Sequence, residues 1–182
     1  MRIKQEKIDL NGKELLLRAP EEEDAGLLID FLKTICGETR FLSRDPEEIH
    51  YTVEGEREYI KCINESGREM MMLAFLDGEF VGNCSLGSLG GARRAHSAEF
   101  GIGLFLRFTS MGIGTVLLEK TIELAREMGF EQLELKATAS NVRGIGLYTK
   151  MGFVECGRIP NSEKYTDGTY DDMVIMVKDL RK

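Results

Sequence analysis

The sequence feature that most constrains the fold is the stretch from Ala98 to Met128, where a strand pattern changes to a helix pattern across a glycine-bearing loop. Residues 98–106 carry few charges and many β-forming side chains. Residues 108–114 are small and turn-prone. From Ile113 the apolar residues recur at helical spacing, and Gly129 follows where a left-handed C-cap is expected. The stretch therefore predicts a strand, a loop and a long helix.

A loop that enters a helix leaves several backbone N–H groups without intrahelical partners. Those donors, with the positive end of the helix dipole, suit a phosphate or diphosphate, and Gly112 and Gly114 would let the main chain approach it closely. An ordinary strand-to-helix turn explains the same glycines equally well. Two commoner nucleotide-binding motifs are excluded. The chain has no Gly-Lys-Ser/Thr run, and neither Gly101-Ile102-Gly103 nor Gly112-Ile113-Gly114 is followed by a third glycine three residues later.

Composition narrows the class of protein and its partners. The 182 residues, 42% hydrophobic and 30% charged, suit one domain over residues 1–182 with a substantial core. No apolar run approaches the roughly 20 residues of a membrane span. Residues 1–10 lack the apolar core of a secretion signal, so a cytoplasmic protein is expected. The net charge of −7 argues against nucleic acid as a partner, and two histidines with four widely spaced cysteines predict no metal site.

Hydrophobic periodicity and turn residues predict the remaining elements. Strands are expected at residues 14–18, with a short one ending at Leu10, and at 70–76, 80–89, around Glu99, at 131–138, from Phe153 and at 173–177. Helices are expected at residues 21–35, ended by Cys36-Gly37, at 45–66 with a break near Gly55, and at 142–151. This order favours one α/β domain with a mixed sheet.

Three groups of residues in this layout resemble the GNAT superfamily of acyl-CoA-dependent N-acetyltransferases. The resemblance covers nearly the whole chain in element order. It implies a mixed, mostly antiparallel sheet of six to seven strands flanked by about four helices. The first group is Thr109-Ser110-Met111-Gly112-Ile113-Gly114, followed by Thr115. It resembles the family loop Gln/Arg-x-x-Gly-x-Gly/Ala, which holds the CoA diphosphate on backbone amides. Thr109 stands where Gln or Arg is usual, and Arg107 is either a replacement donor or a solvent-facing strand residue.

The second group is Asn141, Gly144 and the run from Leu147 to Phe153. It is similar to the family stretch Asn-x-x-Ala-x-x-x-Tyr-x-x-x-Gly-Phe, and the resemblance implies that Asn141, Gly144 and Tyr148 lie at the cofactor site. Asn141 also stands where a helix N-cap is expected. Tyr148 matches the tyrosine that relatives use beside the CoA sulfur, which implies that its hydroxyl protonates the departing thiolate. A half-buried helix aromatic is the structural alternative.

The third group is Ala98-Glu99-Phe100, on the strand before the loop. Several relatives carry a glutamate here as general base, so the resemblance implies that Glu99 accepts the proton of the amine. A surface carboxylate is the alternative. In the family the pantetheine arm pairs with this strand, here at about Leu104, Phe105 and Leu106, in the gap before the next parallel strand. A backbone N–H near Leu106 is the expected oxyanion donor.

The resemblance implies an enzyme that transfers acetyl from acetyl-CoA to a primary amine by direct attack in a ternary complex. The layout looks like the branch with ribosomal-protein and polyamine acetyltransferases, so the acceptor is expected to be a small amine or a protein N-terminal amine. Carboxylates within residues 47–58 lean slightly towards a polyamine, although a solvated helix face explains them as well. Relatives often form homodimers, and the sequence does not decide whether this chain does. A non-catalytic acyl-CoA sensor is the alternative, because Thr109 departs from the loop motif.

Overall fold

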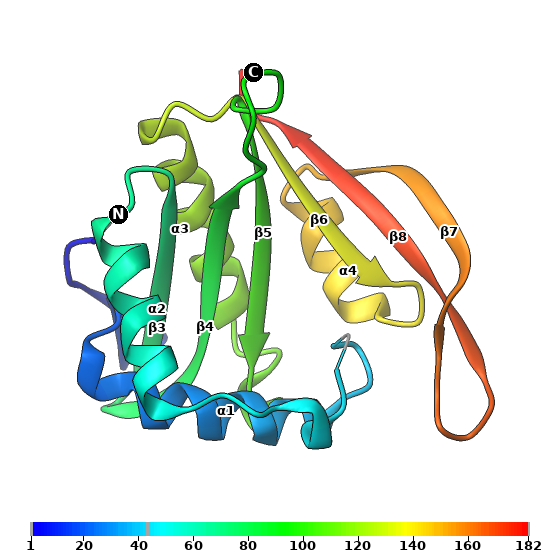
Figure 1. Ribbon diagram of the computed structural model, residues 1–182. Helices are drawn as coiled ribbons and strands as arrows, with labels where there is room; N and C mark the ends of the chain where they lie inside the picture. The colour runs from blue at the N-terminus through cyan, green and yellow to red at the C-terminus, as the bar shows by residue number, and fades with distance from the viewer. Residues whose placement is uncertain (1, 43, 182) are drawn as a thin grey trace.

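The computed structural model describes residues 2–42 and 44–181, and its main element is a sheet with the strand order β1-β2-β3-β4-β5-β6-β8-β7 (Figure 1). The strands are β1 (Glu6–Leu10), β2 (Lys13–Arg18), β3 (Glu69–Leu76), β4 (Glu79–Ser88), β5 (Ser97–Leu104), β6 (Gln132–Thr138), β7 (Val154–Lys164) and β8 (Tyr170–Asp179). Neighbours are antiparallel except β5 and β6, which are parallel. The mixed, mostly antiparallel sheet is confirmed. It has eight strands within the described residues, because β1 pairs fully with β2.

Helices cover both faces of the sheet (Figure 1). The helices are α1 (Ala25–Glu38) and α2 (Val53–Glu65) on one face, and α3 (Ile113–Glu127) and α4 (Val142–Lys150) on the other. Successive side chains of each strand point to opposite faces of the sheet, so one strand contributes to the hydrophobic cores on both faces. In β3, Met71 and Leu73 belong to the core under α1 and α2, whereas Met70 and Met72 belong to the core under α3. In the described parts of the chain, no helix has the length and apolar character needed to cross a bilayer.

Two helix boundaries differ from those predicted. Cys36-Gly37 does not end α1, which continues to Glu38, because Ile35 and Cys36 are buried and packing outweighs the low helix propensity of glycine. The segment 45–66 forms a short 3-10 turn, Pro46–Glu48, and then α2. The break lies at residues 49–52 rather than at Gly55, because the Thr52 hydroxyl caps α2 by accepting from the Gly55 N–H at 3.1 Å.

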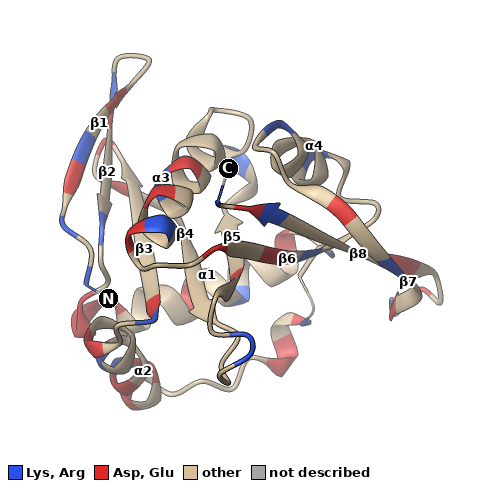
Figure 2. Ribbon diagram, turned by 90° about the horizontal axis from the view of Figure 1, so that it is seen from above, with Lys and Arg blue, Asp and Glu red and all other residues tan. Residues whose placement is uncertain are grey.

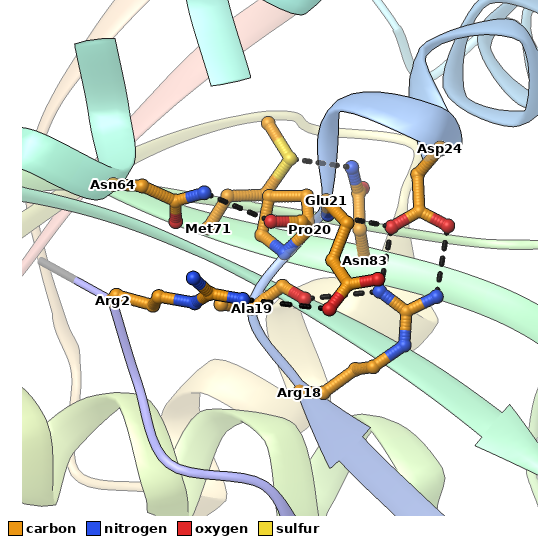
Figure 3. A network of polar contacts seen from close by, with 9 residues as sticks. All are labelled: Arg2, Arg18, Ala19, Pro20, Glu21, Asp24, Asn64, Met71 and Asn83. Carbon is orange, nitrogen blue, oxygen red and sulfur yellow. Dashed lines mark hydrogen bonds and ion pairs between the residues drawn. The ribbon is translucent and has the colours of Figure 1, made fainter. Parts of the chain in front are cut away.

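A partly buried ion pair fixes the start of α1 against the end of β2 (Figure 3). The guanidinium of Arg18 donates to both carboxylate oxygens of Asp24, at 2.5 and 2.8 Å, and the Glu21 N–H donates to the same carboxylate at 2.7 Å. Burial opposes ionisation of Asp24, but these hydrogen bonds outweigh it and hold the pKa of Asp24 below its ordinary value. The network therefore orients α1, whose far end reaches the site described below.

β5 and β6 separate soon after they meet. They pair only from Ser97↔Gln132 to Glu99↔Glu134, after which β5 stays with β4 and β6 stays with β8. Figure 1 shows the two strands diverging from their common end. Beyond Glu99, the main-chain groups of β5 that face β6 therefore have no strand partner on that side among residues 2–42 and 44–181. An open strand edge is left in the middle of the sheet.

Candidate active site

A cavity of about 1110 Å³ opens where β5 and β6 diverge. Its walls come from the end of α1, the loop after it and α2, from strands β3 to β8, from the loop before α3 with the first turn of that helix, and from α4. The predicted site residues that line it are Glu99, Leu104, Leu106, Thr109, Ser110, Gly112, Gly114, Thr115, Asn141, Gly144 and Tyr148. The fold thus brings most of the predicted residues to one place.

Three predicted residues do not line the cavity. Phe105 packs edge-on against Phe31, with ring centroids 4.9 Å apart, and joins β5 to α1. Ile113 is fully buried in the core, and Met111 lies in a small hollow beside the turn between β1 and β2. The side chains of these three residues therefore serve packing. Only the main-chain groups of these residues remain candidates for ligand binding.

The loop before α3 presents main-chain donors at the cavity wall. Among the described residues, none accepts a hydrogen bond from the N–H groups of residues 110–114. The Thr115 N–H donates to the Gly112 carbonyl at 3.1 Å, which removes it from the predicted donors. Gly112 is the N-cap of α3 with a φ of 90°, a conformation that suits glycine. Five open amides at the positive end of a helix make the loop suited to an anion.

Thr109 belongs to a hydrogen-bond chain that joins this loop to α4. Its hydroxyl donates to the Leu106 carbonyl at 2.7 Å and accepts from Nη1 of Arg143 at 2.6 Å. Arg143 lies in the first turn of α4 and lines the cavity. Arg107 instead pairs with the exposed Glu79 at 2.7 Å, away from the cavity wall, as a solvent-facing residue would. Sequence reasoning missed Arg143, although this residue lies between Asn141 and Gly144, which the family motif includes.

Asn141 caps α4 as predicted, since its side-chain oxygen accepts from the Gly144 N–H at 3.0 Å. A Cβ at Gly144 would lie 2.6 Å from the Asn141 amide nitrogen, so a larger residue would require the capping side chain to shift. Both residues therefore shape the start of α4 at the cavity wall. Their contact with a cofactor stays a prediction.

Tyr148 extends from α4 into the cavity wall and is only 9% exposed. Its ring packs edge-on against Phe100 and Phe153, with centroids 6.5 and 6.1 Å away. No described residue hydrogen-bonds its hydroxyl. Burial raises the pKa of Tyr148 to about 12, so the phenol is protonated at neutral pH and can donate.

Glu99 is the last residue of β5 that pairs with β6. Its neighbour Phe100 is buried with Tyr148 in the α3–α4 layer, so the Glu99 side chain lies on the opposite face of the sheet. The side chain is 47% exposed and its Oε1 lies 3.4 Å from the Lys136 ammonium. Glu99 and Tyr148 therefore approach the cavity from opposite faces, with the open edge of β5 between them.

The Leu106 N–H, expected as the oxyanion donor, already has a partner. It donates to the Glu38 carboxylate at 2.7 Å, and Leu106 begins a 3-10 turn rather than extending β5. The Leu106 N–H itself is therefore not open, and a donor near Leu106 stays a prediction. Glu38 is a second cavity residue that sequence reasoning missed. Because the Phe105 N–H pairs with Val81 of β4, alternation directs the N–H of Leu104 towards the open side. Leu104 is therefore a candidate donor in the gap.

The acidic segment within residues 47–58 lies outside the cavity wall. Its five carboxylates, Glu47, Glu48, Glu54, Glu56 and Glu58, are not among the lining residues. Figure 2 shows acidic positions along α2, on the outer side of the sheet. The slight preference for a polyamine acceptor therefore has no support from the position of these carboxylates. The carboxylates that do line the cavity are Glu38, Glu69, Glu99 and Glu163.

A mixed sheet that splays beside a helix start with open amides is the architecture expected of an acyl-CoA-dependent transferase. Comparison with known families agrees, because residues 37–153, well over half of the chain, match the acetyltransferase (GNAT) family. The chain belongs to this family. The predicted family and fold class are thereby confirmed.

Three relatives illustrate the similarity. A GNAT-family acetyltransferase structure from Streptococcus pneumoniae shares 31% identity and a TM-score of 0.87, covering 91% of this chain and 99% of that one. A ribosomal-protein-alanine N-acetyltransferase structure from Brucella melitensis shares 26% identity and a TM-score of 0.79, covering 90% and 98%. The L-amino acid N-acetyltransferase AaaT of Escherichia coli (strain K12) is 29% identical over 110 residues, which span 59% of this chain and 66% of that protein.

Proposed function

We propose that this chain is an N-acetyltransferase that transfers acetyl from acetyl-CoA to a primary amine in a ternary complex. The proposal rests on the cavity where β5 and β6 diverge. This cavity joins the open amides of residues 110–114 to the edge of β5 between Glu99 and Tyr148. The amides bind the CoA diphosphate, and the pantetheine arm follows β5 into the gap. This route brings the thioester to the point where the two side chains meet from opposite faces.

The chemistry follows from these positions. The amine must be neutral to attack, although an α-amine has a pKa near 8 and an alkyl amine near 10. Glu99 accepts its proton, directly or through water, and the amine nitrogen then bonds to the thioester carbon. The carbon–sulfur bond breaks, and the protonated phenol of Tyr148 gives its proton to the departing sulfur. The nitrogen then loses its second proton, which returns to the phenolate directly or through water, so an amide and a free thiol are formed. Positioning of an already activated thioester supplies much of the rate.

The acceptor we propose is the α-amine of an amino acid or of a protein N-terminus. Relatives whose names specify such acceptors support this class. Carboxylates of Glu69, Glu99 and Glu163 line the cavity and would attract a cationic amine. The alternative of a non-catalytic sensor depends on the missing Gln or Arg at position 109. The guanidinium of Arg143 beside Thr109 weakens that argument, because it supplies a long donor at the same place.

A thiol-release assay tests this function directly. The purified chain is incubated with acetyl-CoA and, separately, with free amino acids, N-terminal peptides, polyamines and aminoglycosides. Steady release of free CoA with an amino acid or peptide, and an acetylated product by mass spectrometry, supports the proposal. Tight CoA binding with no turnover across the whole panel would favour the sensor instead.

A further inference from the structure

Arg143 places a positive charge beside the anion-binding loop. Its Nη1 donates to the Thr109 hydroxyl at 2.6 Å, and that hydroxyl is itself fixed by donating to the Leu106 carbonyl at 2.7 Å. The contact joins α4 to a residue 34 positions earlier, just before the open amides. Thr109 therefore orients the guanidinium towards the loop rather than contacting a ligand with a long side chain of its own.

The charge of Arg143 is not compensated within the described residues. The other cations of the cavity wall have carboxylate partners, since Lys136 lies 3.4 Å from Glu99 and Arg40 lies 3.8 Å from Asp167. No described carboxylate forms an ion pair with Arg143, in a chain whose net charge is −7. A guanidinium in the first turn of a helix is also disfavoured by the helix dipole. Helix stability therefore does not explain this residue, whereas an anionic ligand does.

We propose that Arg143 is the phosphate-binding cation of the acyl-CoA site and takes the role that a long donor at position 109 would otherwise have. The inference rests on the proposed function and deepens it. The open amides of residues 110–114 supply only partial charges to a diphosphate. A guanidinium adds a full charge and a fork of donors that matches phosphate oxygens. The phosphate bound is either the diphosphate or the 3′-phosphate of the nucleotide, which share this chemistry.

The test compares the wild-type chain with Arg143→Ala and Arg143→Lys. The control is Arg107→Ala, which removes the same charge from a neighbouring surface site outside the cavity wall. CoA affinity is measured by calorimetry, and kinetics are measured with acetyl-CoA, dephospho-acetyl-CoA and the phosphate-free thioester S-acetyl-N-acetylcysteamine. Loss of one charge-assisted contact should weaken CoA binding by about tenfold or more in Arg143→Ala. The lysine variant should lose less, and the control should match wild type.

The donor series separates ligand binding from a structural role. Arg143→Ala should raise the KM for acetyl-CoA while leaving kcat and the activity with the phosphate-free thioester near wild-type values. A defect that disappears with dephospho-acetyl-CoA assigns the contact to the 3′-phosphate, and one that persists assigns it to the diphosphate. The double variant Thr109→Arg/Arg143→Ala should recover CoA affinity, because it restores a cation at the family position.

Wild-type CoA affinity in Arg143→Ala would overturn the inference, as would an equal loss with the phosphate-free donor. Either result leaves the proposed function standing, because the wild-type chain is measured alongside. Failure of the wild-type chain to bind CoA at all would overturn both.

Discussion

At the residue scale, the two proposed catalytic side chains have opposite surroundings. Tyr148 is buried among aromatic rings, whereas Glu99 is half exposed beside Lys136. Burial disfavours the charged form of the phenol, so Tyr148 keeps its proton and suits an acid. The Glu99 carboxylate lies on the solvent-open side of the cavity, where it can accept a proton from a bound amine. The division of roles thus follows from the environments of the side chains.

Replacing Tyr148 by Phe should lower kcat while leaving CoA affinity nearly unchanged. The change removes the proton donor but keeps the ring that packs on Phe100 and Phe153, so a loss of about a hundredfold is expected from general-acid catalysis. Because burial raises the pKa of Tyr148 to about 12, its deprotonation should not limit wild-type activity at any pH below about 11. Steady-state kinetics with calorimetry measure both quantities, and wild-type turnover in the variant would refute the acid role.

Replacing Glu99 by Gln should produce a defect that depends on pH. At pH 7 an α-amine is mostly protonated, so loss of the base should lower kcat/KM by about a hundredfold. Near pH 9 the amine is neutral in solution, and the defect should shrink. A pH profile of the two proteins with one peptide acceptor measures this. A defect of constant size from pH 6 to 9 would contradict the role of Glu99 as base.

At the scale of elements, the start of α3 is the proposed ligand site, whereas the start of α1 contributes to stability. In the loop before α3, five amides have no acceptor among the described residues, and Gly112 with a φ of 90° turns the chain into the helix. The start of α1 is fixed by the contact of Asp24 with Arg18. One element end is therefore open to a ligand, and the other is closed by protein groups.

Replacing Gly112 by Val should abolish CoA binding. A side chain at this φ is strained by about 1–2 kcal/mol, so the turn that presents the amides should be distorted. Gly129→Val is the matched control, because Gly129 has a φ of 78° at the end of α3, outside the cavity. Both variants should lose similar stability in thermal melts, while only Gly112→Val should lose CoA binding. Unaltered binding in Gly112→Val would count decisively against the loop.

Replacing Asp24 by Asn should destabilise the fold by about 2–3 kcal/mol, because it breaks a partly buried, bidentate ion pair. The folded-state pKa of Asp24 is below its ordinary value, so its contribution is complete above pH 4 and is lost as the pH falls through the folded pKa. The variant should therefore show a smaller loss of stability below pH 4 than wild type does. Urea unfolding at pH 7 and at pH 3 measures both effects. Glu79→Gln, which breaks an exposed pair, is the control and should cost less than about 1 kcal/mol; an equal cost would refute the assignment.

At the scale of the whole molecule, local patterns sufficed for most of the fold. The periodicity from Ile113 and the glycine at 129 predicted α3, and the resemblance placed Glu99 and Tyr148 at one site, where the fold brings both to one cavity. The errors come from contacts between distant segments. Glu38 reaches Leu106 across 68 residues and Arg143 reaches Thr109 across 34, and no spacing in the sequence indicates such partners. Packing likewise overrode the propensities of Cys36-Gly37 at the end of α1.

The proposed mechanism requires a diphosphate held by the main-chain amides of residues 110–114 while the thioester lies in the gap between β5 and β6. A crystal structure of the chain with acetyl-CoA tests this most directly. We predict diphosphate oxygens within hydrogen-bond distance of those amides, the pantetheine arm along β5, and the sulfur beside the Tyr148 hydroxyl. Acetyl-CoA bound elsewhere, with the loop amides left unused, would contradict it.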